Sequence, residues 1–166
     1  MNSKPTIVCN AGPLMAFGKL NMLYLLERLY QRVYVGLSVY NEVVIEGLAK
    51  GYPDARLAEI YFERGILIKT QVEQELAVNQ LAETFGIHRG EAETIILAKQ
   101  LKSDWVLIDD LDARRVARIE GLKVKGTLGV LVEAYREDYF TLSELEIIFQ
   151  QIAERSDIWI AEGLCR

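Results

Sequence analysis

The stretch from residue 88 to residue 130 constrains the fold most, because short apolar runs alternate there with amphipathic segments. Residues 105–108 form a short apolar run that predicts a buried strand, and helical patterns over 91–101 and 112–120 flank it. A further strand is predicted over 123–125. Alternating strands and helices indicate an α/β fold, a three-layer α/β/α sandwich with a mainly parallel central sheet.

The remainder of the chain continues this alternation over a total of 166 residues, the length of one domain. We therefore expect a single domain over 1–166, in which about 140–166 form a C-terminal helical extension. Ser38 is the expected N-cap of a helix over 39–45. Residues 158–160 are expected to form a last strand or a turn. The other strands are expected over 6–9, 33–35 and 65–69, and the other helices over 14–20, 22–30, 54–63, 72–85, 127–135 and 140–154.

Charge and composition exclude several classes of protein. A net charge of −5 and a pI of about 5.0 argue against a protein held to nucleic acid by bulk charge. Cys9 and Cys165 make no disulfide framework, and a single histidine, His88, argues against a structural zinc site. No run approaches the roughly 20 apolar residues of a membrane-spanning helix, and the N-terminus lacks a signal-peptide pattern. We therefore expect a cytoplasmic protein without a membrane partner.

Acidic and amide side chains stand at the joints between the predicted elements. Asn10 and Asp109 follow predicted strands, so in a parallel sheet they reach the same edge, where sites form in open α/β folds. Glu91 begins a helix, and Glu42 lies on another. Carboxylates gathered at one edge repel each other unless a divalent cation binds them, and oxygen ligands favour Mg²⁺ or Mn²⁺. Such a cation can activate water and clamp a phosphodiester during hydrolysis.

Each of these residues also has a purely structural interpretation. Asp109 or Asp110 is suited to cap the helix that follows. Glu91 complements a helix dipole, and Glu42 is typical of a solvated helix face. Asn10 before Gly-Pro is typical of a turn. The shared edge, rather than any single residue, favours the functional interpretation.

A basic stretch follows the two aspartates. Arg114 and Arg118 lie four residues apart on one helix face, which would suit a phosphate backbone. Pairing with nearby acids on a solvated face is the alternative. His88 and Arg89, just before Glu91, are candidate contacts to substrate. The basic residues are Arg114, Arg115, Arg118, Lys123 and Lys125.

Five short segments together resemble a known family. They are VCNAGPL at 8–14, VYNEV at 39–43, RGEAE at 89–93, LIDD at 107–110 followed by Ala113 and Arg114, and GTLGV at 126–130. In this order they resemble the PIN-domain superfamily, and more narrowly its prokaryotic PIN-like branch DUF3368. The resemblance covers most of the chain from Thr6 to about Tyr135.

The resemblance implies an α/β/α sandwich with a metal-dependent nuclease site that acts on single-stranded RNA. Many similar proteins are toxins of toxin–antitoxin pairs, and many are homodimers. The resemblance thus implies an RNA substrate, a possible antitoxin partner and a homodimer.

Carried over by position, the resemblance implies roles for individual residues. The acid of the third segment falls on Glu91, with Glu93 as the less favoured choice. The catalytic residues would be Glu42, Glu91 and Asp109. The ligands of Mg²⁺ or Mn²⁺ would be Asn10, Glu42, Glu91, Asp109 and Asp110, and the substrate contacts would be Arg89, Arg114 and Thr127.

One position departs from the family pattern. PIN nucleases usually carry an aspartate where this chain has Asn10. An amide oxygen can still bind Mg²⁺, but it supplies no charge and cannot act as a base. The alternative is therefore a catalytically weak or inactive PIN-like binding or regulatory module.

Overall fold

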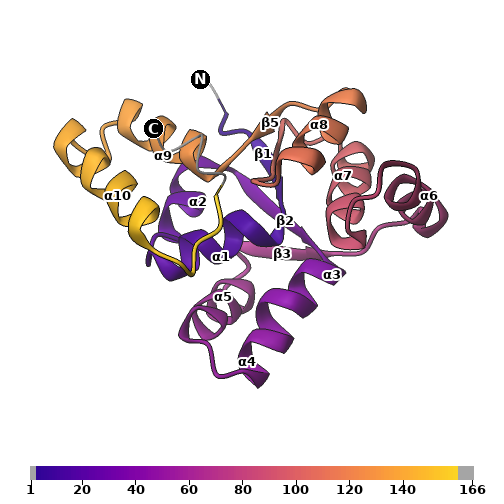
Figure 1. The fold of residues 1–166 in the computed structure, drawn as a ribbon, viewed down its shortest axis with the longest axis horizontal. Helices are drawn as coiled ribbons and strands as arrows, with labels where there is room; N and C mark the ends of the chain where they lie inside the picture. The colour runs from indigo at the N-terminus through magenta and orange to yellow at the C-terminus, as the bar shows by residue number, and fades with distance from the viewer. Residues whose placement is uncertain (1–2, 161–166) are drawn as a thin grey trace.

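The computed structural model describes residues 3–160, which form one five-stranded sheet flanked by helices (Figure 1). The strand order is β3-β2-β1-β4-β5, and every neighbouring pair is parallel. The predicted α/β sandwich is therefore confirmed, with a sheet that is entirely rather than mainly parallel. The strands are β1 (Thr6–Cys9), β2 (Arg32–Gly36), β3 (Leu67–Thr70), β4 (Trp105–Leu107) and β5 (Val124–Lys125).

Helices cover both faces of the sheet, because the central strand is apolar on both. Ile7 and Cys9 of β1 belong to one hydrophobic cluster, and Val8, which points the opposite way, belongs to a second. In Figure 1, α6 (Glu75–Phe85), α7 (Arg89–Leu101) and α8 (Leu111–Ile119) lie on one side. The helices of the other cluster are α1 (Ala11–Lys19), α2 (Tyr24–Leu29), α5 (Pro53–Glu63), α9 (Thr127–Arg136) and α10 (Leu142–Glu154).

The order of the strands reverses beside β1. The chain moves outward from β1 through β2 to β3, then returns to place β4 on the other side of β1. At such a switch point the connections after two adjacent strands diverge to opposite faces, which leaves a crevice beyond their C-terminal ends. Asn10 directly follows β1, and its backbone N–H donates to the carbonyl of Leu107, the last residue of β4. The crevice therefore opens next to Asn10 and Asp109.

The helical segment after β2 differs from the prediction. It runs without a break through α3 (Leu37–Tyr40), a π-helix η1 (Asn41–Glu46) and α4 (Gly47–Ala49). The prediction of Ser38 as its N-cap is wrong, because Gly36 occupies that position. The backbone N–H and the hydroxyl of Ser38 both donate instead to a carboxylate 55 residues away, that of Glu93. A tertiary contact has replaced the local cap.

The C-terminal part packs on the domain as a helix followed by a turn. α10 buries Leu145, Ile148 and Ile152, and Ile158 is also buried. Residues 156–158 form a turn and bend, so the turn rather than the strand is present. The rest of the predicted extension, with Cys165, lies outside the described residues. Within 3–160, no helix has the length and apolar character to cross a membrane.

Candidate active site

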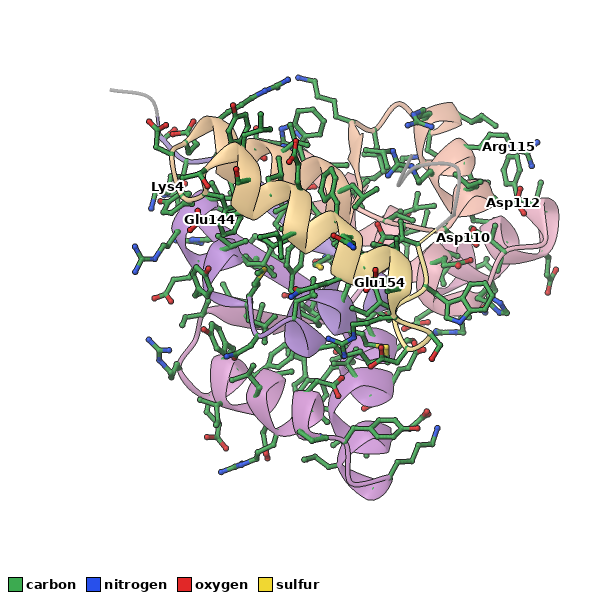
Figure 2. The ribbon with its side chains drawn as sticks, turned by 60° about the vertical axis from the view of Figure 1, so that its left-hand side comes forward. Lys4, Asp110, Asp112, Arg115, Glu144 and Glu154 are labelled. Atoms are coloured by element: carbon green, nitrogen blue, oxygen red, sulfur yellow. The ribbon has the colours of Figure 1, made fainter. Side chains whose placement is uncertain are left out.

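A cavity of about 620 Å³ lies beyond the C-terminal ends of β1 and β4, where the strand order predicts a crevice. Figure 2 labels two of its acidic residues, Asp110 and Asp112, at the start of α8, beside the segment that follows α10. The cavity brings together all five predicted metal ligands. Its lining residues are Asn10, Ala11, Gly12, Glu42, His88, Gly90, Glu91, Asp109, Asp110, Leu111, Asp112 and Trp159.

Asp109 is a buried carboxylate that two hydrogen bonds hold in place. Its Oδ1 accepts from the backbone N–H of Thr127 at 2.7 Å, and its Oδ2 accepts from the Thr127 hydroxyl at 2.6 Å. Burial raises the pKa of Asp109, while the bonds from Thr127 and the charge of Arg114 act in the opposite direction. Thr127, the first residue of α9, is completely buried, so its visible role is to orient Asp109.

Asp110 has the structural role that its neighbour lacks. It is the N-cap of α8, and its Oδ1 accepts from the backbone N–H of Ala113 at 2.9 Å. The two adjacent aspartates therefore have different surroundings. Asp109 is oriented by tertiary contacts, whereas Asp110 caps the helix and lines the cavity at the same time.

Asn10 is buried, with 7% of its surface exposed, and it presents an amide to the cavity. It stands at the N-cap position of α1 but makes no side-chain cap hydrogen bond. Its Oδ1 accepts from the hydroxyl of Thr94 on α7 at 3.1 Å. The side chain is therefore oriented across the sheet edge rather than used in a local turn.

Of the two glutamates at the start of α7, Glu91 faces the cavity. Its Oε2 accepts from the backbone N–H of His88 at 2.9 Å, as in a capping box. Burial raises the pKa of Glu91, and the negative charges of Asp110 and Glu42 raise it further, against the effect of the His88 bond. Acids from three separate helical segments thus influence one another across the cavity.

Glu93 points away from the cavity into the protein. Its carboxylate is 2% exposed and accepts from the Ser38 N–H at 2.9 Å and the Ser38 hydroxyl at 2.6 Å. Arg89 also donates to it, at 3.1 Å. Glu93 is thus fully engaged in joining α7 to α3, the helix that leads into η1 and Glu42.

Glu42 reaches the cavity from the π-helix η1. Partial burial raises the pKa of Glu42, and repulsion from Glu46 adds to the rise. π-Helical turns are rare and often occur at functional sites.

The three predicted substrate contacts occupy different surroundings. Arg89 forms ion pairs with Glu93 and with Glu75 on α6. Arg114 donates to the carbonyl of Ile108 at 3.0 Å and lines a second cavity of about 250 Å³, which also contains Asp109. Thr127 is buried against Asp109, and contact of any of the three with substrate stays a prediction.

The donor atoms fit a hard divalent cation by their chemistry. The amide of Asn10 and five carboxylate side chains, those of the four predicted acidic ligands and Asp112, offer oxygen ligands, the type that Mg²⁺ and Mn²⁺ prefer. Among residues 3–160, no three His, Cys, Asp or Glu side chains form a ready-made metal-binding cluster. Burial raises the pKa of Glu42 and Glu91 and repulsion between acids adds to the rise, and a cation would nevertheless offset both effects.

The sequence analysis gave no site role to Thr94, Leu111, Asp112 or Trp159, which lie at or beside the cavity. Thr94 lies three residues after Glu91 on α7, so helical spacing alone could have placed it on the same side as that acid. Leu111 and Trp159 also line the cavity. Nothing in the local pattern around these two apolar residues separates them from ordinary packing positions.

The family comparison agrees with this geometry. The model of the family DUF3368, described as a PIN domain, matches residues 6–166. No curated protein matches the chain. PIN domains as a family suggest a nuclease-type function. A match over nearly the whole sequence means that this chain belongs to the PIN-domain family DUF3368.

Proposed function

We propose that this protein is a metal-dependent endoribonuclease of the PIN type, which hydrolyses phosphodiester bonds in single-stranded RNA. The observation that carries the proposal is the acidic cavity at the switch point of the sheet. Asn10, Glu42, Glu91 and Asp109 reach it from four separate segments of the chain and present oxygen ligands. PIN domains generally use divalent metal ions, which fits this donor set.

The residues of the cavity divide the work of hydrolysis. Asn10, Glu42, Glu91, Asp109 and Asp110 would hold Mg²⁺ or Mn²⁺, which when bound supplies Lewis-acid stabilisation of the phosphate and activation of water. Asp109 is fixed by two hydrogen bonds and so offers a ligand that needs no reorganisation. Glu42 and Glu91, the other two proposed catalytic acids, would complete the ligand set from η1 and α7.

The proposal extends to the biological context that the family resemblance implies. In that context the protein is the toxin of a toxin–antitoxin pair, acts as a homodimer in the cytoplasm, and is restrained by an antitoxin protein. Arg89 and Arg114 are the proposed contacts to the RNA backbone, since Arg89 lies in sequence between two residues of the cavity and Arg114 lines a second cavity together with Asp109.

The test is cleavage of labelled single-stranded RNA by purified protein with Mn²⁺ or Mg²⁺. Asp109→Asn is the informative variant, because its amide can accept from the Thr127 N–H and donate to the Thr127 hydroxyl, so only the charge is lost. Cleavage should fall by about 100-fold or more, the order seen when a group that stabilises the transition state is removed. Glu146→Gln, which removes an exposed acid on α10, is the matched control and should keep full activity. Equal cleavage by Asp109→Asn and wild type would overturn the assignment.

A catalytically silent binding module is the second candidate, and Asn10 is the observation that favours it. The amide supplies no charge, and it already accepts a hydrogen bond from Thr94. The variant Asn10→Asp separates the two candidates. A large gain in metal-dependent cleavage would identify a weakened nuclease site, whereas no binding of Mn²⁺ by either form would favour the silent module.

A further inference from the structure

Trp159 is the most exposed large apolar side chain that the structure describes, and it lines the acidic cavity. Its side chain is 89% exposed. It shares the cavity with Asn10, Glu91 and Asp109, although it comes from the far end of the sequence. Tryptophan is highly buried on average, so an indole this exposed at a cavity is available to contact a ligand.

The segment that carries Trp159 is anchored on both sides of the turn. Arg155 pairs with Asp157 at 2.7 and 2.8 Å and donates to the carbonyl of Lys19 at 3.1 Å, while the Lys19 ammonium donates to the carbonyl of Asp157 at 2.6 Å. Ile158 is buried in the core. Figure 2 shows this segment turning back from α10 toward the start of α8, where Asp110 is labelled. The indole is thus presented at the cavity by a fixed turn.

The chemistry of the cavity favours a nucleobase as the group that meets this indole. The acids of the cavity repel the phosphates of RNA unless a cation lies between them. Without a cation, much of the binding free energy of an RNA substrate must therefore come from uncharged contacts. An aromatic plane stacks on any base, and this contact suits single-stranded RNA, whose bases are free. Leu111, 56% exposed, also lines the cavity and adds an apolar surface.

We infer that Trp159 stacks on a base of the RNA strand adjoining the scissile phosphate, and so positions that phosphate at the acids. This inference rests on the proposed function. It makes Trp159 a substrate-binding residue, contributed by the segment after α10 to a site otherwise built at the edge of the sheet.

Fluorescence gives a direct test, because the chain has only two tryptophans. In the variant Trp105→Phe, Trp159 is the single indole, and a short oligouridylate added with Ca²⁺ should quench its emission. Trp159→Ala should weaken binding of the labelled oligonucleotide by roughly 5- to 150-fold, the range for loss of one base–aromatic stack. Trp159→Phe should restore most of the affinity. Leu142→Ala, an exposed apolar residue on α10, is the matched control and should bind as wild type.

Cleavage assays separate failure of this inference from failure of the proposed function. If wild type cleaves RNA, Trp159→Ala should raise KM with little change in kcat, because stacking contributes to binding in ground and transition states alike. Unchanged KM and unquenched emission would overturn the inference, with the nuclease intact. Quenching by RNA without cleavage would support stacking and overturn the nuclease proposal. Absence of both binding and cleavage would overturn both.

Discussion

Removing the Thr127 hydroxyl tests whether Asp109 is held as a buried charge. Thr127→Val is nearly isosteric and removes only the donor that lies 2.6 Å from Oδ2 of Asp109. A hydrogen bond to a charged group contributes about 1.5–3 kcal/mol to stability, and both residues are buried. The free energy of unfolding should therefore fall by about that amount at neutral pH. Thr127→Ser keeps the hydroxyl and should lose only about 1 kcal/mol for the missing methyl group.

The pH dependence of this loss gives a sharper test. Burial already raises the pKa of Asp109, so the folded protein binds a proton more readily than the unfolded chain. Stability therefore falls as pH rises from the pKa of Asp109 in the unfolded chain to its higher pKa in the folded protein. Loss of the hydroxyl raises the pKa in the folded protein further, so this pH range becomes wider. The deficit of Thr127→Val should thus be larger at about pH 8 than at about pH 5, where more of Asp109 is protonated.

Urea denaturation of wild type and the two variants at both pH values measures these differences. The slope of the transition should be the same for the three proteins, so that midpoints report stability alone. If Thr127→Val lost no more than Thr127→Ser, or lost the same amount at both pH values, Asp109 would not be a buried carboxylate whose charge the Thr127 hydroxyl stabilises.

Further predictions concern the contact between Gly36 and Glu93, the acids of the cavity and the binding of Mg²⁺. In Gly36→Ala the new Cβ would stand 2.1 Å from Oε1 of Glu93, so the unfolding free energy should fall by about 1–3 kcal/mol, whereas Gly90→Ala, with 4.0 Å of clearance, should be neutral or slightly stabilising in denaturation assays. Without metal, Glu42→Gln should raise the melting temperature, because it removes a carboxyl group whose raised pKa means that its charge destabilises the fold. Asp110→Ala should lower the free energy of unfolding by about 0.5–2 kcal/mol, because it removes the N-cap of α8. Mg²⁺ at ten times its Kd should stabilise the protein by about 1.4 kcal/mol at neutral pH. Calorimetry should show that this gain vanishes on acidification, because the carboxyl groups with raised pKa values, Glu42 and Glu91, take up protons.

The parts of the site fixed by backbone direction could be predicted from the sequence. Asn10 and Asp109 follow apolar strands, and a parallel sheet brings the C-terminal ends of its strands to one edge whatever the side chains do. The sequence pattern did not show that β1 and β4 are neighbours, yet this adjacency sets the two residues beside each other. Their separation thus depends on strand order, which local periodicity does not encode.

The family resemblance favoured Glu91 over Glu93, but the helical pattern alone does not separate the two. Two residues apart on α7, they point in nearly opposite directions, and only the position of the helix in the fold decides which one reaches the cavity. The sequence likewise did not show the π-helix that carries Glu42. Ser38 suggests a local helix cap, and only the structure shows that its hydroxyl binds Glu93 instead. Contacts between distant segments decided both outcomes.

The helices around the cavity explain how the fold tolerates so many acids without a cation. Asp110 caps α8, Glu91 accepts the His88 N–H at the start of α7, and Asp109 accepts the N–H of the first residue of α9. Three helix N-termini, with their partial positive charges, therefore meet at the carboxylates. Glu42 lies inside a continuous helical run and lacks this compensation. A bound cation would supply at Glu42 the compensation that the helix N-termini supply to the other three acids.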